Sequence, residues 1–163
     1  MIPPPEVILR PAAAADATEI AAIWWSGWRD GHIGNVPDAL VALRTADSFD
    51  RRARKRIGDA TVATVGGDVA GFVMVSDDEI EQVYVAAAHR GTTVAAQLLA
   101  AGESIVAQRG FGVAWLAVVE GNARARRFYE RGGWSNAGRL DYVVEDQGVV
   151  VDVPTLRYEK PVG

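Results

Sequence analysis

The sequence predicts a mixed α/β fold in which one sheet of about seven strands packs against four helices. Two observations lead to this prediction. Short runs rich in β-branched residues recur between turn-forming residues, and stretches with the period of an amphipathic helix separate these runs. We expect the element order β-α-α-β-β-β-α-β-α-β-β, without an internal repeat.

The N-terminal residues predict a leader followed by a strand. Residues 1–6 contain three consecutive prolines, which are typical of an extended, disordered segment. A single domain is expected over residues 7–160. Its first strand runs from Val7 to Arg10 and ends at Pro11, because proline has no N–H to donate to a neighbouring strand.

Two helices are expected next. Asp16 or Thr18 can cap the first of them. Its apolar positions, spaced four residues apart, are Ile20, Trp24 and Trp28. Two glycines and a proline between residues 31 and 37 predict a loop. The second helix is predicted from Asp38 to Ile57.

Three strands follow in close succession. The first two, Thr61 to Val65 and Val69 to Val75, are rich in β-branched residues. The link Gly66-Gly67-Asp68 between them is typical of a hairpin turn. Glu79 to Val85 is predicted to be the third strand of this group.

The second half of the chain alternates helices and strands. A helix is predicted from Thr92 to the glycine at 110, with an apolar face formed by Val94, Leu98, Ala101 and Ile105. The apolar run from Gly112 to Val119 predicts a buried central strand. Asn122 can cap a further helix that ends at Gly132-Gly133. The last two strands are expected at Trp134 to Val144 and Val149 to Tyr158, joined by the polar turn Glu145 to Gly148.

Composition excludes several classes of function. The net charge of −4 gives no reason to expect nucleic acid or an anionic membrane as partner. The chain has no cysteine, so disulfides, thiolate metal ligands and a cysteine acyl-enzyme are excluded, and we expect no metal. No apolar run approaches the length of a membrane span, and the first residues do not resemble a signal peptide. A soluble, cytoplasmic protein is therefore expected.

The segment from Arg90 to Ala95 lies between a predicted strand and a long predicted helix. The first N–H groups of a helix have no partner within it, and the helix dipole adds positive potential there. Such an end can hold an anion, and Arg90 could add a charge-assisted contact. Many helices begin with similar residues, so this segment alone predicts only a general anion site.

A second strand-to-helix junction makes the interpretation more specific. Its residues Asn122, Ala125, Phe128, Tyr129, Gly133 and Trp134 match the pattern N-x-x-A-x-x-F-Y-x-x-x-G-F. The earlier junction matches Q/R-x-x-G-x-G/A at Arg90, Gly91, Thr92, Thr93, Val94 and Ala95, except that Thr93 stands where glycine is usual. Together they resemble the GNAT superfamily of acyl-CoA-dependent N-acyltransferases. The element order agrees with that family over nearly the whole chain after residue 6.

The resemblance implies a mixed, largely antiparallel sheet whose fourth and fifth strands splay apart, and acetyl-CoA as co-substrate. It assigns the pyrophosphate to the segment Arg90 to Ala95 and gives Asn122 a cofactor contact besides its cap. A backbone N–H of Val83, Tyr84 or Val85 would polarise the thioester carbonyl. At Thr93 two interpretations stay open. Its Cβ could crowd the pyrophosphate, or ordinary helical dihedrals could leave cofactor binding intact.

The resemblance also implies acid and base roles. Tyr129 occupies the family's general-acid position, although a core tyrosine is the plain alternative. For the base we select Glu81, with Glu79, His32 and water as alternatives. Glu79 and Glu81 would share one face of a regular strand. Since the chain has no cysteine, we expect the amine to attack directly within a ternary complex.

The acceptor would bind beside the first helix, where the predicted substrate-binding residues are Trp25 and His32. Trp25 projects roughly 100° away from the apolar stripe of that helix. The basic run Arg51 to Arg56 is more typical of a solvated helix end than of a site for the 3′-phosphate of CoA or an acidic acceptor.

We expect a small-molecule primary amine as the acceptor. A protein lysine or N-terminus is the alternative, and the segment Asp30 to Leu40 should distinguish them by covering or opening the site. A non-catalytic acyl-CoA-binding regulatory domain is the alternative from a different class. A homodimer is compatible with this fold.

Overall fold

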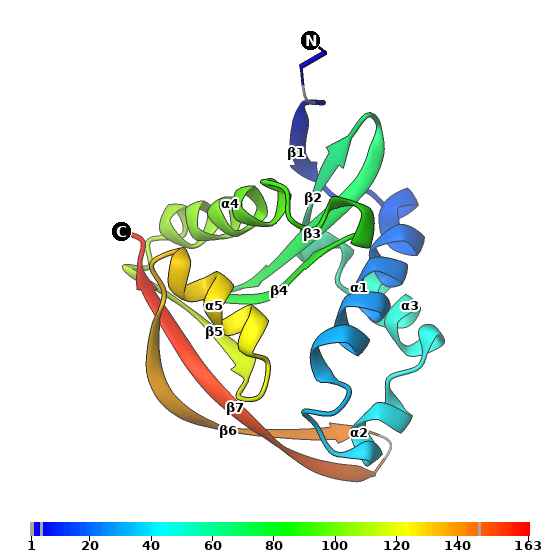
Figure 1. Ribbon diagram of the computed structural model, residues 1–163, viewed down its shortest axis with the longest axis vertical. Helices are drawn as coiled ribbons and strands as arrows, with labels where there is room; N and C mark the ends of the chain where they lie inside the picture. Colours follow the sequence, from blue (N-terminus) through cyan, green and yellow to red (C-terminus); the bar gives the residue numbers. More distant parts are fainter. Residues whose placement is uncertain (1, 4, 147) are drawn as a thin grey trace.

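The computed structural model describes residues 2–3, 5–146 and 148–163, and its strands form one sheet in the order β1-β2-β3-β4-β5-β7-β6 (Figure 1). Neighbouring strands are antiparallel except for β4 and β5. The strands are β1 (Val7–Pro11), β2 (Ala60–Val65), β3 (Asp68–Ser76), β4 (Glu79–Val85), β5 (Val113–Val119), β6 (Ser135–Asp146) and β7 (Val149–Pro161). The predicted mixed α/β fold is confirmed.

Helices cover both faces of the sheet. They are α1 (Ala17–His32), α2 (Asp38–Leu43), α3 (Ala46–Lys55), α4 (Val94–Gln108) and α5 (Ala123–Arg131). Side chains of α4 and α5 pack into one apolar cluster with β5 and β7, whereas those of α1, α2 and α3 pack into a second cluster on the other face. The sheet therefore has two separate cores, and a site between β4 and β5 can open to both sides.

The prediction of one helix from Asp38 to Ile57 is wrong, because the chain forms two helices there. Arg44 leaves the helical region at φ −94° and ψ 76°, and Thr45 is extended. The Thr45 hydroxyl oxygen then accepts a hydrogen bond from the Ser48 N–H at 3.2 Å and so caps α3. The sequence holds this capping signal, but the apolar period runs through it. The fold consequently has five α-helices in the described residues, not four.

The parallel strands β4 and β5 meet at one end and then separate. Glu79 lies opposite Trp115 in the only registered position between them within the described residues. Asp78 holds this end closed: its carbonyl accepts from the Trp115 N–H at 3.1 Å, and its carboxylate accepts from the indole N–H at 3.0 Å. Beyond this point the β5-facing edge of β4 is left open, as the family resemblance implied.

A β-bulge in β4 reorients its side chains. The register with β3 shifts between the pairs Met74–Gln82 and Val75–Ile80, which leaves one extra residue on β4. In a regular strand Ile80 and Tyr84 would share a face. Instead, Ile80 packs into the α4 cluster and Tyr84 against the α1 cluster. The bulge thus directs Tyr84 toward α1, and the regular strand assumed for Glu79 and Glu81 does not exist.

Two predictions fall partly outside the described residues. The leader includes residues 1 and 4, and the described residues before Val7 have no regular secondary structure. The turn between β6 and β7 includes Gln147, which is also outside them. Among the described residues, no helix is both long and apolar enough to cross a membrane.

Candidate active site

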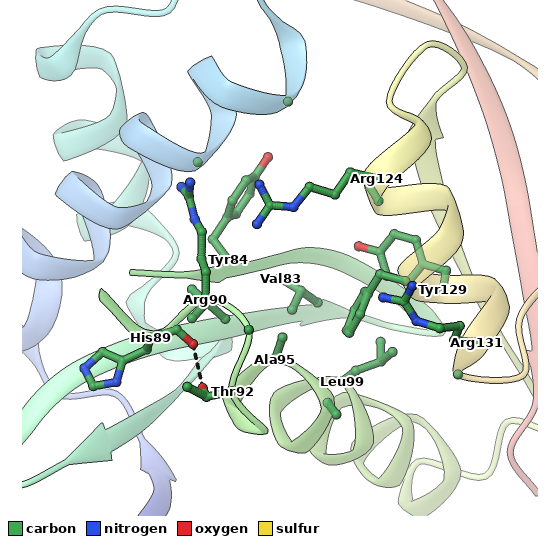
Figure 2. A pocket seen from close by; sticks show the side chains of 18 of the residues that line it. Val83, Tyr84, His89, Arg90, Thr92, Ala95, Leu99, Arg124, Tyr129 and Arg131 are labelled. Atoms are coloured by element: carbon green, nitrogen blue, oxygen red, sulfur yellow. Dashed lines mark hydrogen bonds between the residues drawn. The ribbon is translucent and has the colours of Figure 1, made fainter. Parts of the chain in front are cut away.

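A cavity of about 790 Å³, called here the large cavity, opens where β4 and β5 separate (Figure 2). Its walls come from β4, the loop before α4, the first turns of α4, one face of α1, and α5. The predicted cofactor residues that line it are Val83, Tyr84, Val85, Arg90, Gly91, Thr92, Ala95 and Asn122. Thr93 and Val94 are not among the described residues that line it. The structure thus brings together eight of the ten residues of this set.

The loop before α4 exposes backbone to the large cavity. Gly91 has φ +76°, a conformation that favours glycine. The Thr92 hydroxyl donates to the carbonyl of His89 at 2.5 Å, which fixes the turn that starts the helix (Figure 2). The first N–H groups of a helix have no acceptor within it, so this 15-residue helix presents N–H donors at its start.

Thr93 adopts ordinary helical dihedrals, with φ −79° and ψ −4°. Its hydroxyl oxygen accepts a hydrogen bond from Nε2 of Gln97 at 2.9 Å, one turn further along the surface of α4. The side chain is therefore engaged along the helix and away from the cavity lining. Of the two interpretations of Thr93, this geometry favours intact binding over crowding.

The charged side chains of the large cavity are mainly basic. Its cations are Arg90, Arg124, Arg131 and Lys160, and its carboxylates are Asp30 and Glu103. Arg90 forms an ion pair with Asp30 at 2.7 Å, and Lys160 forms one with Glu103 at 2.5 Å. Figure 2 shows Arg124 reaching from α5 toward Tyr84, while Arg90 points toward α1 on the other side of Tyr84. Four cations against two carboxylates favour a polyanionic ligand.

Two glycines of α1 allow this helix to approach β4 and α5 closely. A Cβ on Gly27 would collide with the ring of Tyr84, and a Cβ on Gly31 would lie 2.7 Å from Nδ2 of Asn122. Both glycines line the large cavity. This role was not predicted, although an i, i+4 pair of glycines within a helix signals close packing.

The open edge of β4 presents particular backbone groups. The N–H of Ala86 donates to the carbonyl of Ala70 on β3 at 2.8 Å. Because N–H groups alternate in direction along a strand, those of Val85 and Val83 point away from β3, toward the splayed side. Val83 and Val85, rather than Tyr84, therefore offer backbone donors to a ligand.

A second cavity of about 160 Å³, called here the small cavity, lies on the α1 side of β4. The residues that it shares with the large cavity are Val83, Tyr84, Asn122, Ala125 and Tyr129. Its remaining wall is formed by Trp28, His32, Leu40, Arg44, Arg52, Glu79, Glu81, Gln82, Ala117, Val118, Val119, Val153 and Thr155. The two cavities thus meet at β4 and Tyr129.

Tyr129 extends from α5 to this junction, where Figure 2 shows its hydroxyl pointing into the large cavity. Its ring packs beside Phe128, Trp134 and Tyr158, with centroid distances of 5.3 to 6.3 Å. Burial raises the pKa of Tyr129 to about 12. The phenol therefore remains protonated at neutral pH and is available as a hydrogen-bond donor.

The two glutamates of β4 differ in their surroundings. The Glu81 carboxylate accepts a hydrogen bond from Arg56 at 2.5 Å, within an ion pair that also includes Asp59. Glu79 has no such ion pair among the described residues. Burial, together with the charge of Glu81, raises the pKa of Glu79 to about 7. Glu79 can thus exchange a proton near neutral pH.

Of the two predicted substrate-binding residues, one lines a cavity and the other does not. His32 lines the small cavity, where its ring stacks on Trp28 at 4.6 Å and its Nδ1 lies 2.9 Å from the Trp28 carbonyl. Burial, and then the charges of Arg44 and Arg52, lower the pKa of His32 to about 4, so the ring is neutral at pH 7. Trp25 is not among the described residues that line either cavity, and its ring lies under the guanidinium of Arg29 at 5.2 Å.

The basic run contains a residue that sequence reasoning missed. Arg54 pairs with Asp50 on the surface of α3, as expected of a solvated helix end. Arg52 instead places its guanidinium over the rings of Trp24 and Phe49, at 4.3 and 5.1 Å, and lines the small cavity. The available signal was its spacing: Arg52 stands three residues after the buried Phe49 and so shares its helix face.

Comparison with known proteins agrees with this geometry. Residues 18–134 match the model of the acetyltransferase (GNAT) family. This chain therefore belongs to the GNAT family of acetyltransferases, whose co-substrate is acetyl-CoA. The predicted family, enzyme class and co-substrate are confirmed at this level. Comparison with curated proteins finds no match.

Solved structures share the fold. A GCN5-related N-acetyltransferase from Rhodopseudomonas palustris is 21% identical, with a TM-score of 0.71 over 96% of this chain and 98% of that one. The PaiA N-acetyltransferase from Thermoplasma acidophilum, solved with coenzyme A, is 14% identical, with a TM-score of 0.71 over 96% and 99%. YncA from Salmonella typhimurium, solved with acetyl-CoA, is 19% identical, with a TM-score of 0.69 over 97% and 95%.

Proposed function

We propose that this protein transfers an acetyl group from acetyl-CoA to the primary amine of a small molecule, by direct attack in a ternary complex. The observation that carries the proposal is the junction of the two cavities. A large, basic cavity and a smaller one meet at the open edge of β4 beside Tyr129. Such an arrangement brings a donor from one side and an acceptor from the other to a single point.

The residues of the large cavity fit acetyl-CoA. The start of α4 and the side chain of Arg90 would hold the pyrophosphate, and the outward N–H groups of Val83 and Val85 would bind the thioester carbonyl and the pantetheine arm. Arg124 adds positive charge on the same side. The volume of about 790 Å³ lies within the range of roughly 300–1,000 Å³ of ligand pockets. When bound, acetyl-CoA supplies an activated acyl group on a thiolate leaving group.

We assign the base to Glu79 in place of the sequence-based choice, Glu81. A base needs a pKa near the working pH, and it must not already be held by a cation. Glu79 has a pKa of about 7 and lines the small cavity, whereas Glu81 is engaged by Arg56. The buried, neutral His32 is a weaker proton acceptor at neutral pH because its pKa lies near 4.

The roles combine into one reaction. Glu79 takes a proton from the acceptor ammonium, directly or through water, which frees the nitrogen lone pair. The backbone N–H of Val83 stabilises the negative charge that develops on the carbonyl oxygen as the N–C bond forms. Tyr129 donates its proton to the sulfur as the C–S bond breaks, and the second proton of the amine, released as the amide forms, restores the Tyr129 phenol directly or through water.

The size of the small cavity, about 160 Å³, supports a small molecule over a peptide. Leu40 of α2 forms one wall, and Val153 and Thr155 of β7 form another. Helix α2 also packs against β7. These contacts support the proposal that the segment Asp30 to Leu40 covers the acceptor site. A cytoplasmic location and a homodimer remain predictions.

Two measurements test the proposed function. Calorimetric titration of the protein with acetyl-CoA should show one binding site. A thiol-release assay over small amines and lysine peptides should then show turnover with small amines. Binding without turnover on any amine would support the non-catalytic acyl-CoA-binding domain. A properly folded protein that gives no binding at all would exclude the enzyme.

A further inference from the structure

The small cavity carries charges of both signs on different walls. Arg44, at the break between α2 and α3, and Arg52 of α3 contribute guanidinium groups, whereas Glu79 and Glu81 contribute carboxylates from β4. An amine acceptor needs only the carboxylates. The arginines would repel an ammonium group and attract an anionic one, so the small cavity offers each sign of charge a different wall.

The position of Arg52 is fixed by packing. Its guanidinium lies over Trp24 and Phe49, and both of these rings are fully buried. Both arginines lie close enough to His32 that their charges help to lower its pKa. A guanidinium has five N–H donors, so one arginine can contact a ligand as well as the protein groups that Arg44 and Arg52 engage. Planar guanidinium groups match carboxylates, with which they form paired, charge-assisted hydrogen bonds.

Size restricts the ligand further. The small cavity has about 160 Å³, well below the roughly 300–1,000 Å³ that is typical of sites for drug-sized ligands. Trp28 closes one side, with the neutral ring of His32 stacked on it. Aminoglycosides and folded peptide segments are too large for this space, and long polyamines would place additional ammonium groups beside Arg44 and Arg52.

We propose that the acceptor is a small amine that also carries a carboxylate, of the size of a free amino acid. Its carboxylate faces Arg44 and Arg52, and its amine faces Glu79 and Tyr129 at the junction of the two cavities. This inference rests on the proposed acetyl transfer and specifies which amines undergo it.

Matched substrates test the inference directly. A thiol-release assay compares each free amino acid of a panel with its carboxamide, which has the same side chain and amine but lacks the carboxylate. Spermidine and a lysine-containing peptide complete the panel. For the best substrate, we expect kcat/KM of the acid to exceed that of its amide by roughly ten- to a hundredfold, the effect of charge-assisted hydrogen bonds.

Variants test the assigned residues. Arg44→Gln should raise KM for the amino acid and bring the acid-to-amide ratio close to one, without changing KM for acetyl-CoA. Arg44→Lys should restore part of the ratio. Arg52→Gln serves as a second variant, with its folding checked by thermal unfolding because Arg52 packs on buried rings. Arg54→Gln is the matched control, since Arg54 lies on α3 outside the cavity and should leave all constants unchanged.

The outcomes separate the two proposals. Turnover of amides or spermidine at rates equal to those of amino acids would overturn the carboxylate assignment while leaving acetyl transfer intact. A preference for the lysine peptide would also overturn it. If no amine in the panel is acetylated, the proposed function itself fails.

Discussion

The two cavities of this protein are built in different ways, although they share β4 and Tyr129. Most of the lining of the large cavity comes from two contiguous motifs, around Arg90 and around Asn122, each at the start of a helix. The small cavity collects its lining from α1, α2, α3, β4, β5, α5 and β7. The cofactor side is thus specified by local sequence, and the acceptor side by how distant elements meet. One family can therefore keep its cofactor while its acceptors differ.

The largest expected effect is at the junction of the cavities. Tyr129→Phe removes the proton donor but keeps the ring among Phe128, Trp134 and Tyr158. Turnover should fall on the order of 10³-fold, within the range of general acid catalysis. Steady-state kinetics should show this loss with an unchanged affinity for acetyl-CoA. Normal turnover in a folded variant would make Tyr129 a core residue only.

The second prediction concerns the wall of the small cavity on β4. Glu79 must be deprotonated to act as base, so kcat/KM should fall as pH drops below about 7. Glu79→Gln should remove this fall of kcat/KM at low pH, the acidic limb of the pH profile. It should also lower kcat/KM at pH 8 on the order of 10²-fold. Glu81→Gln is the matched control and should retain the limb. A pH profile that loses its limb in the Glu81 variant instead would reassign the base.

The third prediction concerns how the stability of the folded protein depends on pH through His32, which lines the same cavity. The pKa of His32 is about 4 in the folded protein and near 6.5 when exposed, so the unfolded chain binds more protons between these values. The contribution of the neutral His32 ring to the free energy of unfolding is therefore complete above pH 6.5 and is lost as pH falls toward 4. At pH 4.5 the loss should be roughly 2–3 kcal/mol. Urea unfolding at pH 7 and 4.5 should show a smaller loss in His32→Gln; an equal loss would place the acid sensitivity elsewhere.

A smaller effect is expected in the large cavity. Asp30 pairs with Arg90 and places a carboxylate where a phosphate ligand would bind. Because Asp30 is 54% exposed, the effect of the charge is modest. Asp30→Asn should tighten binding of acetyl-CoA by roughly two- to fivefold in calorimetry. Asp47→Asn, at the exposed start of α3, should not change it. Weaker binding in the Asp30 variant would mean that the ion pair positions Arg90.

The smallest effect is expected at the position that departs from the family pattern. Thr93→Gly should leave the affinity for acetyl-CoA within about twofold, since a glycine at a helix start costs only a few tenths of a kcal/mol. Gly91→Ala is the contrasting variant. It should weaken binding because a Cβ is strained at φ +76°. If Thr93→Gly binds much more tightly than the parent protein, the crowding interpretation was right.

Much of the fold could be predicted because its signals are local. The hairpin at Gly66-Gly67, the cap at Asn122 and the apolar period of α4 each depend on residues a few positions apart. The break at Thr45 was missed because a single cap competes with a continuing apolar period. The bulge near Glu81 was missed because it exists only in the register of β4 with β3.

The sequence by itself determined the family, the helix start from Arg90 to Ala95 that we propose as the cofactor segment, and the place of Tyr129 on the helix after Asn122. These features depend on helix starts and short spacings, which contiguous residues fix. The tertiary structure decided what surrounds the proposed acceptor site: Arg52 and His32 line the small cavity and Trp25 does not. Arg56 pairs with Glu81, whereas burial raises the pKa of Glu79 to about 7. Burial and charge at those positions arise from elements far apart in the chain. The shifted pKa values of Glu79 and His32 and the shape of the small cavity therefore exist only after these elements have packed together.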